Sequence, residues 1–351
     1  MTIADFRLVP YALPLREPVA WGGQTHAQRL GVLVRLEGAD GAVGWGEAAP
    51  LPGFSDESLD EVRTELASLA EVLRGRVLSP AEALLGGSVA TALDASGLSP
   101  SARFGLDLAL AELAAQELGR TLPQALHPDP AVVLPLNGLV MGTGGNAVAS
   151  ARRLGEWGYA AVKLKVGRQP VDADLALVVA VREVLPGKVA LRLDANRAWG
   201  WDDAVRFADG VRGLALDYVE EPLADASRLP ELWHDTGLSV AVDESVQEGV
   251  PIRGWATAAV LKPTLVGGIG AAIRLATEAR LVGVRPVLSA AFESGVGLRG
   301  IAALAAATGA EPAGLDTYRW LAADVLGPLP FDRPRVDVAA LFSTPPEVAL
   351  P

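Results

Sequence analysis

The chain has 351 residues, of which 50% are hydrophobic, and it contains no cysteine. This length can form one large barrel and a smaller domain, and the absence of cysteine excludes disulfides and thiolate metal sites. A formal net charge of −12 at pH 7 argues against a nucleic-acid partner, which would require a basic face. No apolar stretch long enough to span a bilayer is free of charge or proline, and no signal-peptide pattern opens the chain, so we expect a cytoplasmic protein without a membrane partner.

The first part of the chain is expected to form strands and then helices. Strands are predicted at 6–11, 30–37 and 42–47, with a turn at 38–41 between the last two. Residues 17–29, which contain Gly22-Gly23, are expected to form a mobile loop that acts as a lid. Helical patterns follow at 58–73, 80–85 and 101–118.

From Val132 the pattern alternates between short apolar runs and helical segments, which is typical of a parallel sheet closed into a barrel. The strands are expected to begin near Val132, Ala160, Val189, Leu216, Ser239, Ala258 and Arg285. The proline-rich tail from Asp316 leaves this pattern and is expected to return to the N-terminal domain. We therefore predict an α/β protein, a modified TIM (β/α) barrel (99–315) with an α+β capping domain formed by 1–98 and the tail 316–351.

Three carboxylates stand at the ends of successive predicted strands: Asp194, Glu220 and Asp243. Barrels place their active sites at the C-terminal ends of their strands, so these side chains should converge. Clustered carboxylates repel one another unless a cation neutralises them. Oxygen ligands favour Mg²⁺, and the three histidines (His26, His127 and His234) are too scattered to suggest a histidine site.

Lysines flank the three carboxylates. Lys163 and Lys165 precede the metal strands and share one face of their strand, whereas Lys262 ends the strand after them. Lys165 and Lys262 should therefore lie on opposite sides of the metal. Neighbouring positive charges would favour the neutral amine that a base requires. A lysine base beside Mg²⁺ indicates removal of a proton next to a carboxylate, with the metal stabilising an ene-diolate. The neighbouring Glu221 and Glu244 should face away from the metal.

These motifs resemble the enolase superfamily, in its muconate-lactonizing-enzyme-like group, and most closely its o-succinylbenzoate synthase family. The resemblance covers essentially the whole chain and rests on the motifs at 45–47, 50–55, 163–165, 193–199, 220–222, 243–245, 262–268, 289–298 and 314–318. It implies dehydration of 2-succinyl-6-hydroxy-2,4-cyclohexadiene-1-carboxylate to o-succinylbenzoate and water in menaquinone biosynthesis. The partner would then be a small-molecule carboxylate, and a homo-oligomer is compatible with the sequence.

The resemblance also implies roles for individual residues. Asp194, Glu220 and Asp243 would bind Mg²⁺, for which Mn²⁺ could substitute. Lys165 would be the base, and Lys262 would stabilise the enolate from the opposite face. The substrate would be bound by Lys163, Asn196, Ser289, Glu293 and Arg29, with the 289–294 segment offering backbone N–H groups to the succinyl arm and Trp21 a ring contact.

Two alternatives stay open at this point. An isomerase, such as an N-succinylamino acid racemase (alone or as a second activity of a bifunctional enzyme), a dipeptide epimerase or a muconate cycloisomerase, would use the same two lysines. A non-enzymatic scaffold with the same fold should lack a metal ligand or the base, and none is missing here.

Overall fold

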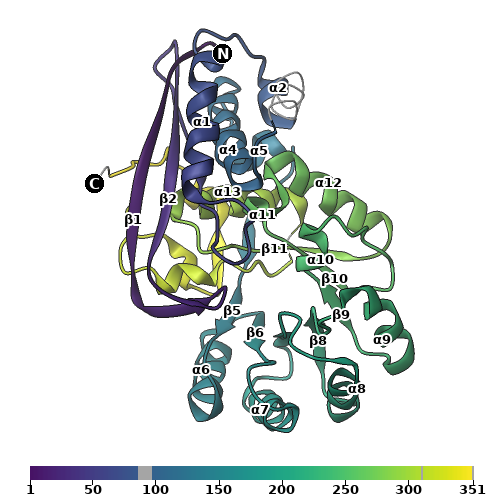
Figure 1. The fold of residues 1–351 in the computed structure, drawn as a ribbon. Helices are drawn as coiled ribbons and strands as arrows, with labels where there is room; N and C mark the ends of the chain where they lie inside the picture. The colour runs from purple at the N-terminus through teal and green to yellow at the C-terminus, as the bar shows by residue number, and fades with distance from the viewer. Residues whose placement is uncertain (86–96, 310, 350–351) are drawn as a thin grey trace.

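The computed structural model describes residues 1–85, 97–309 and 311–349. In these residues a three-stranded antiparallel sheet with its helices packs against a parallel barrel (Figure 1). The predicted architecture, a modified TIM barrel with a cap, is confirmed. Within the described ranges, no helix has both the length and the apolar character needed to cross a bilayer.

The capping sheet consists of β1 (Ile3–Trp21), β2 (Gln24–Gly38) and β3 (Val43–Ala48), paired in that order. The segment expected to be a loop at 17–29 is instead strand on both sides of a two-residue turn. Trp21 pairs with Gln24, and the intervening Gly22 and Gly23 have φ of 56° and 73°. Two consecutive positive φ angles suit a tight hairpin whose twist matches that of its strands, so the glycines make a turn and not a long loop.

Helices cover one face of this sheet (Figure 1). Helix α1 (Leu59–Leu73) starts with a Ser58–Glu61 capping box and buries a stripe of four apolar residues, while α2 (Pro80–Leu85) is short. Helix α4 (Pro100–Glu117) is buried nearly all round because it packs between the sheet and the barrel helices. Its contact with β3 is so close that a Cβ atom on Gly46 would lie 1.8 Å from the Gly105 carbonyl oxygen.

Seven parallel strands form the barrel sheet, in the order β11-β10-β9-β8-β7-β6-β5. Isolated bridges join Ser289 to Gly314 and Leu136 to Ala313, so the 313–314 segment closes the ring between the two edge strands. The strands are β5 (Asn137–Val140), β6 (Ala161–Lys165), β7 (Ala190–Asp194), β8 (Leu216–Glu220), β9 (Val240–Val242), β10 (Ala258–Leu261) and β11 (Arg285–Leu288).

Helices follow each of these strands, and the long ones lie outside the barrel (Figure 1). They are α6 (Gly144–Trp157), α7 (Val171–Val184), α8 (Trp201–Gly210), α9 (Leu229–Thr236), α10 (Glu244–Gln247), α11 (Pro263–Val266), α12 (Gly268–Leu281) and α13 (Gly295–Thr308), while α5 (Leu122–Leu126) precedes the barrel and the one-turn 3₁₀ segment η1 (Ala226–Arg228) precedes α9.

One predicted barrel strand belongs elsewhere. The run near Val132 forms β4 (Val133–Pro135), which pairs antiparallel with β12 (Arg335–Asp337) of the tail, and the barrel begins at β5. The tail also contains η2 (Asp316–Trp320), η3 (Pro330–Asp332) and α14 (Val338–Leu341). It touches the capping sheet, since Ala322 N donates to the Pro14 carbonyl at 2.8 Å.

Candidate active site

Six charged side chains meet at the C-terminal end of the barrel. In the sheet register Lys165 lies beside Asp194, which lies beside Glu220, so the three stand on adjacent strands at the same height. Asp243 and Lys262 follow directly after β9 and β10. Parallel strands in register thus bring together residues that are up to about a hundred positions apart in the chain.

The lysines and carboxylates of this cluster are interleaved. Lys165 Nζ lies 2.6 Å from Asp194 Oδ2, and Lys163 Nζ lies 3.0 Å from the same oxygen and 3.2 Å from Glu220 Oε1. Lys262 Nζ pairs with Asp243 Oδ2. The carboxylates are almost fully buried, so each charge has lost its hydration and depends on these partners.

Burial and neighbouring charge act in opposite directions on these groups. Burial lowers the pKa of Lys163 and of Lys262, but the surrounding carboxylates outweigh it and raise both above their usual values. For Asp194 and Asp243 burial opposes ionisation, yet the lysines hold the pKa of each below its usual value. Burial and the charges of Asp194 and Asp243 raise the pKa of Glu220 well above its ordinary value.

The loops after β7 and β8 adopt backbone that favours glycine, although glycine is absent from these positions. The φ angles are 43° at Asn196, 60° at Arg197 and 41° at Glu221. At Glu221 this conformation turns the carboxylate away from the lysines. It accepts hydrogen bonds from the backbone N–H groups of Asp243 and Ser245, each at 2.9 Å, and from Arg197 Nε at 3.0 Å. Glu221 therefore holds the Asp243 backbone in place. Its side chain faces away from the proposed metal position, as predicted from the sequence.

Asn196 is oriented from both ends of its amide. Its Oδ1 accepts from Lys165 Nζ at 2.6 Å, and its Nδ2 donates to Glu244 Oε1 at 2.9 Å. Burial and the Asp243 charge raise the pKa of Glu244 to about 6. The amide therefore has one orientation that satisfies both neighbours, and this orientation steers the Lys165 side chain.

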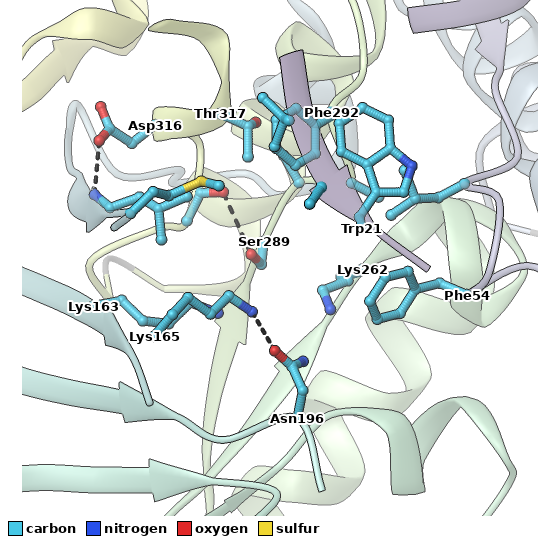
Figure 2. A pocket seen from close by; sticks show the side chains of 18 of the residues that line it. Trp21, Phe54, Lys163, Lys165, Asn196, Lys262, Ser289, Phe292, Asp316 and Thr317 are labelled. Atoms are coloured by element: carbon cyan, nitrogen blue, oxygen red, sulfur yellow. Dashed lines mark hydrogen bonds between the residues drawn. The ribbon is translucent and has the colours of Figure 1, made fainter. Parts of the chain in front are cut away.

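A cavity of about 280 Å³ opens above the cluster. Five residues expected from the sequence to act in catalysis or substrate binding line it, namely Lys163, Lys165, Asn196, Lys262 and Ser289 (Figure 2). Its apolar lining includes three aromatic rings, Trp21 from the hairpin tip, Phe54 from the capping domain and Phe292 from the loop after β11.

Two of these rings contact each other, and Trp21 also contacts a histidine. Trp21 stacks on His26 with ring centroids 4.3 Å apart, and it meets Phe292 at 4.7 Å. Trp21 lines the cavity, and the ring contact expected of it stays a prediction. A cavity with charges at one end and aromatic rings at another suits a ring-bearing carboxylate.

Arg29 and Glu293, both predicted to bind substrate, do not line this cavity. Arg29 is 2% exposed and donates to the carbonyl oxygens of Ala49, Pro50 and Phe292, with the Pro50 contact at 2.7 Å. Glu293 is fully buried, where it accepts from Thr264 Oγ1 at 2.5 Å and from Ala291 N at 2.6 Å. Both side chains hold the loops around the cavity.

The lysine content of the chain singles out this site. The whole sequence contains four lysines, Lys163, Lys165, Lys188 and Lys262, and three of them line the cavity. Apart from Lys188, the other strongly basic side chains of the chain are arginines. Lysine differs from arginine in that its protonation state can be shifted by its surroundings, so these three lysines are the candidates for proton transfer in the cavity.

The donor chemistry of Asp194, Glu220 and Asp243 fits a divalent cation, since three carboxylates offer the hard oxygen ligands that Mg²⁺ prefers. As they stand, however, the described residues include no three acidic or histidine side chains arranged around one point for an ion. The reason is that Lys163 Nζ bridges Asp194 and Glu220, and Lys262 holds Asp243. The three carboxylates would hold a cation after turning away from the ammonium groups.

Several cavity residues were not singled out from the sequence. They are Asn137, Leu139 and Met141 from the first barrel strand and its loop, Arg168 after β6, and Asp316 and Thr317 after the segment that closes the ring. Asp316 lies in the 314–318 motif, but its carboxylate already accepts hydrogen bonds from Arg319, from Leu139 N at 2.7 Å and from Tyr159 Oη at 3.2 Å. The misplaced first strand explains why the residues around β5 were missed.

Two family models match the chain, "Enolase C-terminal domain-like" over residues 146–341 and "MenC, N-terminal domain" over residues 3–113. An o-succinylbenzoate synthase from Edwardsiella ictaluri (strain 93-146) is 34% identical over 91% of this chain and 92% of its own length. The chain belongs to the o-succinylbenzoate synthase family of the enolase superfamily. This confirms the predicted family, and with it the expectation of an enzyme.

The other proteins that are similar to this chain differ in length and in name. Protein PHYLLO, chloroplastic, from Arabidopsis thaliana is 33% identical over 85% of this chain, and the match spans only 20% of that longer protein. Among solved structures, the L-Ala-D/L-Glu epimerase from Bacillus subtilis is 26% identical over the full chain, with a TM-score of 0.85 and 98% of its length covered. A dipeptide epimerase from Enterococcus faecalis V583, complexed with Mg and a dipeptide, has a TM-score of 0.87 at 23% identity, with 96% and 97% of the two chains covered.

Proposed function

We propose that this protein dehydrates 2-succinyl-6-hydroxy-2,4-cyclohexadiene-1-carboxylate to o-succinylbenzoate and water, as a step of menaquinone biosynthesis. The observation that carries the proposal is that Lys165 and Lys262 line one cavity and each pairs with a buried carboxylate, Asp194 and Asp243 respectively. The likeness to named o-succinylbenzoate synthases along nearly their whole length supports the choice of substrate.

In the proposed reaction Lys165, as a neutral amine, takes the proton from the ring carbon that bears the carboxylate. The electrons of that C–H bond form the enolic double bond, and they then form the new ring double bond as the adjacent C–O bond breaks. The proton on Lys165 passes to the departing hydroxide, which leaves as water on the same face. The product ring is aromatic, so the elimination is strongly downhill.

Other residues of the cavity would stabilise the charge that develops. The Lys262 ammonium, on the opposite flank, would stabilise the enolate, and Lys163 would help to bind the ring carboxylate. Asn196, held by Glu244, would aim the Lys165 amine. Asp194, Glu220 and Asp243 would hold Mg²⁺, and when bound Mg²⁺ supplies positive charge at the substrate carboxylate.

A racemase of N-succinylamino acids is the second candidate, because lysines on both flanks of the cavity suit removal of a proton from one face and its return to the other. Epimerisation of dipeptides is less well supported. A dipeptide ammonium would require a free carboxylate in the cavity. Asp316, the acidic residue among the described residues that line the cavity, already pairs with Arg319.

Steady-state kinetics with Mg²⁺ on the cyclohexadiene carboxylate and on N-succinylamino acids, measured in parallel, test this proposal. Lys165→Met and Lys262→Met should each lower kcat for dehydration by at least about a thousandfold, in the range of a lost acid or base. Lys188→Met is the matched control, since Lys188 is exposed and does not line the cavity. Racemisation without dehydration would refute the proposal and favour the second candidate.

A further inference from the structure

One cation at the cavity is separate from the lysine–carboxylate cluster. Arg168 lies three residues beyond the end of β6, is exposed, and lines the cavity. Throughout the ranges that the structure describes, its guanidinium makes no hydrogen bond or ion pair with protein, whereas the three cavity lysines each contact a carboxylate. Arg168 is therefore available to an anion that enters the cavity.

The backbone that carries Arg168 is firmly held. Val166 N donates to the Asp194 carbonyl at 2.9 Å, and Gly167 N donates to Asp174 Oδ2 at 2.7 Å. Gly167 has a φ of 76°, and a Cβ atom there would lie 2.4 Å from Ala198 Cβ, so the turn accepts no larger residue. Because the backbone is already held, only the Arg168 side chain has to be ordered when the guanidinium binds a ligand.

Most other donors around the cavity are already committed. The N–H groups of Ser289, Ala290 and Ala291, which were expected to contact a succinyl arm, donate to Leu261 O, Gly314 O and Glu293 Oε2 at 2.9, 2.9 and 2.6 Å. Ser294 N donates to Glu47 Oε1 at 2.8 Å. The Thr317 hydroxyl lacks a partner, but it is neutral and accepts as readily as it donates, so it does not select a carboxylate.

We propose that Arg168 binds the distal carboxylate of the succinyl arm and thereby selects dicarboxylate substrates. The inference rests on the proposed function, in which the ring carboxylate occupies the lysine end of the cavity. A second carboxylate needs a cation that is not already neutralised, and the guanidinium fork matches carboxylate geometry. Leu139 and Met141 line the same cavity and offer apolar surface to the methylene groups of the arm.

The test compares two stable ligands, o-succinylbenzoate and 2-butanoylbenzoate, which has a methyl group in place of the distal carboxylate. Their dissociation constants are measured by calorimetry, with Mg²⁺ present, for the wild type, Arg168→Gln and Arg168→Lys. Arg168→Gln should weaken o-succinylbenzoate binding about tenfold, the loss expected for a charged hydrogen bond at a partly open site, and leave 2-butanoylbenzoate unchanged. Arg168→Lys keeps the charge but lacks the two parallel donors of the guanidinium. Its dissociation constant for o-succinylbenzoate should therefore lie between those of the wild type and Arg168→Gln.

Arg152→Gln is the matched control, because Arg152 is exposed on α6 and does not line the cavity, and it should bind both ligands as the wild type does. Added salt should reduce the difference in o-succinylbenzoate affinity between the wild type and Arg168→Gln. If Arg168→Gln weakens both ligands equally, or neither, the inference is overturned, while dehydration by the wild type still supports the proposed function. A wild type that binds neither ligand and dehydrates nothing overturns both.

Discussion

The buried carboxylate of Glu221 allows a quantitative test of how Asp243 is positioned. Its Oε1 accepts from the backbone N–H groups of Asp243 and Ser245, and its Oε2 accepts from Arg197 Nε. In Glu221→Gln the amide oxygen can keep the first pair, but the amide NH₂ then faces the Arg197 donor. The variant loses one charge-assisted hydrogen bond, so we expect a loss of about 2 kcal/mol in the free energy of unfolding.

The same substitution should weaken metal binding. Glu221 acts on Asp243 through the backbone, and partners that orient a ligand typically contribute about 10–100-fold to metal affinity. Urea unfolding with EDTA measures the stability of the metal-free protein, and calorimetric titration with Mg²⁺ measures the affinity of the folded one. The two readings separate a local effect on the ligand from a general loss of structure.

Asp172→Asn is the matched control for Glu221→Gln. It removes a carboxylate from an exposed ion pair with Arg206, at 2.6 Å, and should cost less than about 1 kcal/mol without affecting Mg²⁺. A Glu221→Gln protein as stable as Asp172→Asn, with unchanged Mg²⁺ affinity, would refute the argument that Glu221 positions Asp243.

Three further predictions concern the framework around the site. Arg29→Lys should lower the free energy of unfolding by about 2–3 kcal/mol, because buried carbonyl groups lose their donors; a raised KM with unchanged stability would instead indicate a substrate contact. Burial raises the pKa of Glu112 from 4.5 to about 7, although the charge of Arg299 opposes the shift. The folded state therefore binds the extra proton, and stability should fall as the pH rises from about 4.5 to about 7, with a flatter profile for Glu112→Gln in unfolding measured across that range. Gly46→Ala should cost about 3 kcal/mol or more, seen as a lower urea midpoint, since its methyl group meets the Gly105 carbonyl.

The parts of the site that the sequence predicts are those set by strand order. Lys165, Asp194 and Glu220 end consecutive parallel strands, and the register of such strands brings their last residues to one height. The spacing of the apolar runs was enough to predict this. The turn at Gly22-Gly23 was also visible, but its length was misjudged because the β-branched and polar residues on either side of it were assigned to a loop.

The parts that the sequence does not predict depend on contacts distant in the chain. Arg29 reads as an exposed polar residue near a glycine turn, yet it is buried against carbonyl groups 20 and 262 positions away. Arg168 gives no local signal, since only the ring of strands decides which loop residues face the cavity. The β4 strand has a barrel-like apolar pattern, but its partner lies in the tail, and periodicity does not identify partners.

The capping domain covers the cavity and also holds in place a barrel loop that lines it. The Glu47 carboxylate, on β3, accepts from Ser294 N and Gly297 N at 2.8 Å each, at the start of barrel helix α13, and Tyr11 and Ser294 also donate to it through their hydroxyl groups. Together with Arg29, which reaches the Phe292 carbonyl from the same domain, it holds both ends of the loop that carries Phe292 over the cavity. The lining contributed by the 289–294 loop is therefore tied to the stability of the fold. The hairpin tip is held differently: among the described residues Trp21 Nε1 has no hydrogen-bond partner, and the buried ring is fixed by packing on His26 and Phe292, so ring recognition there is tied to apolar packing.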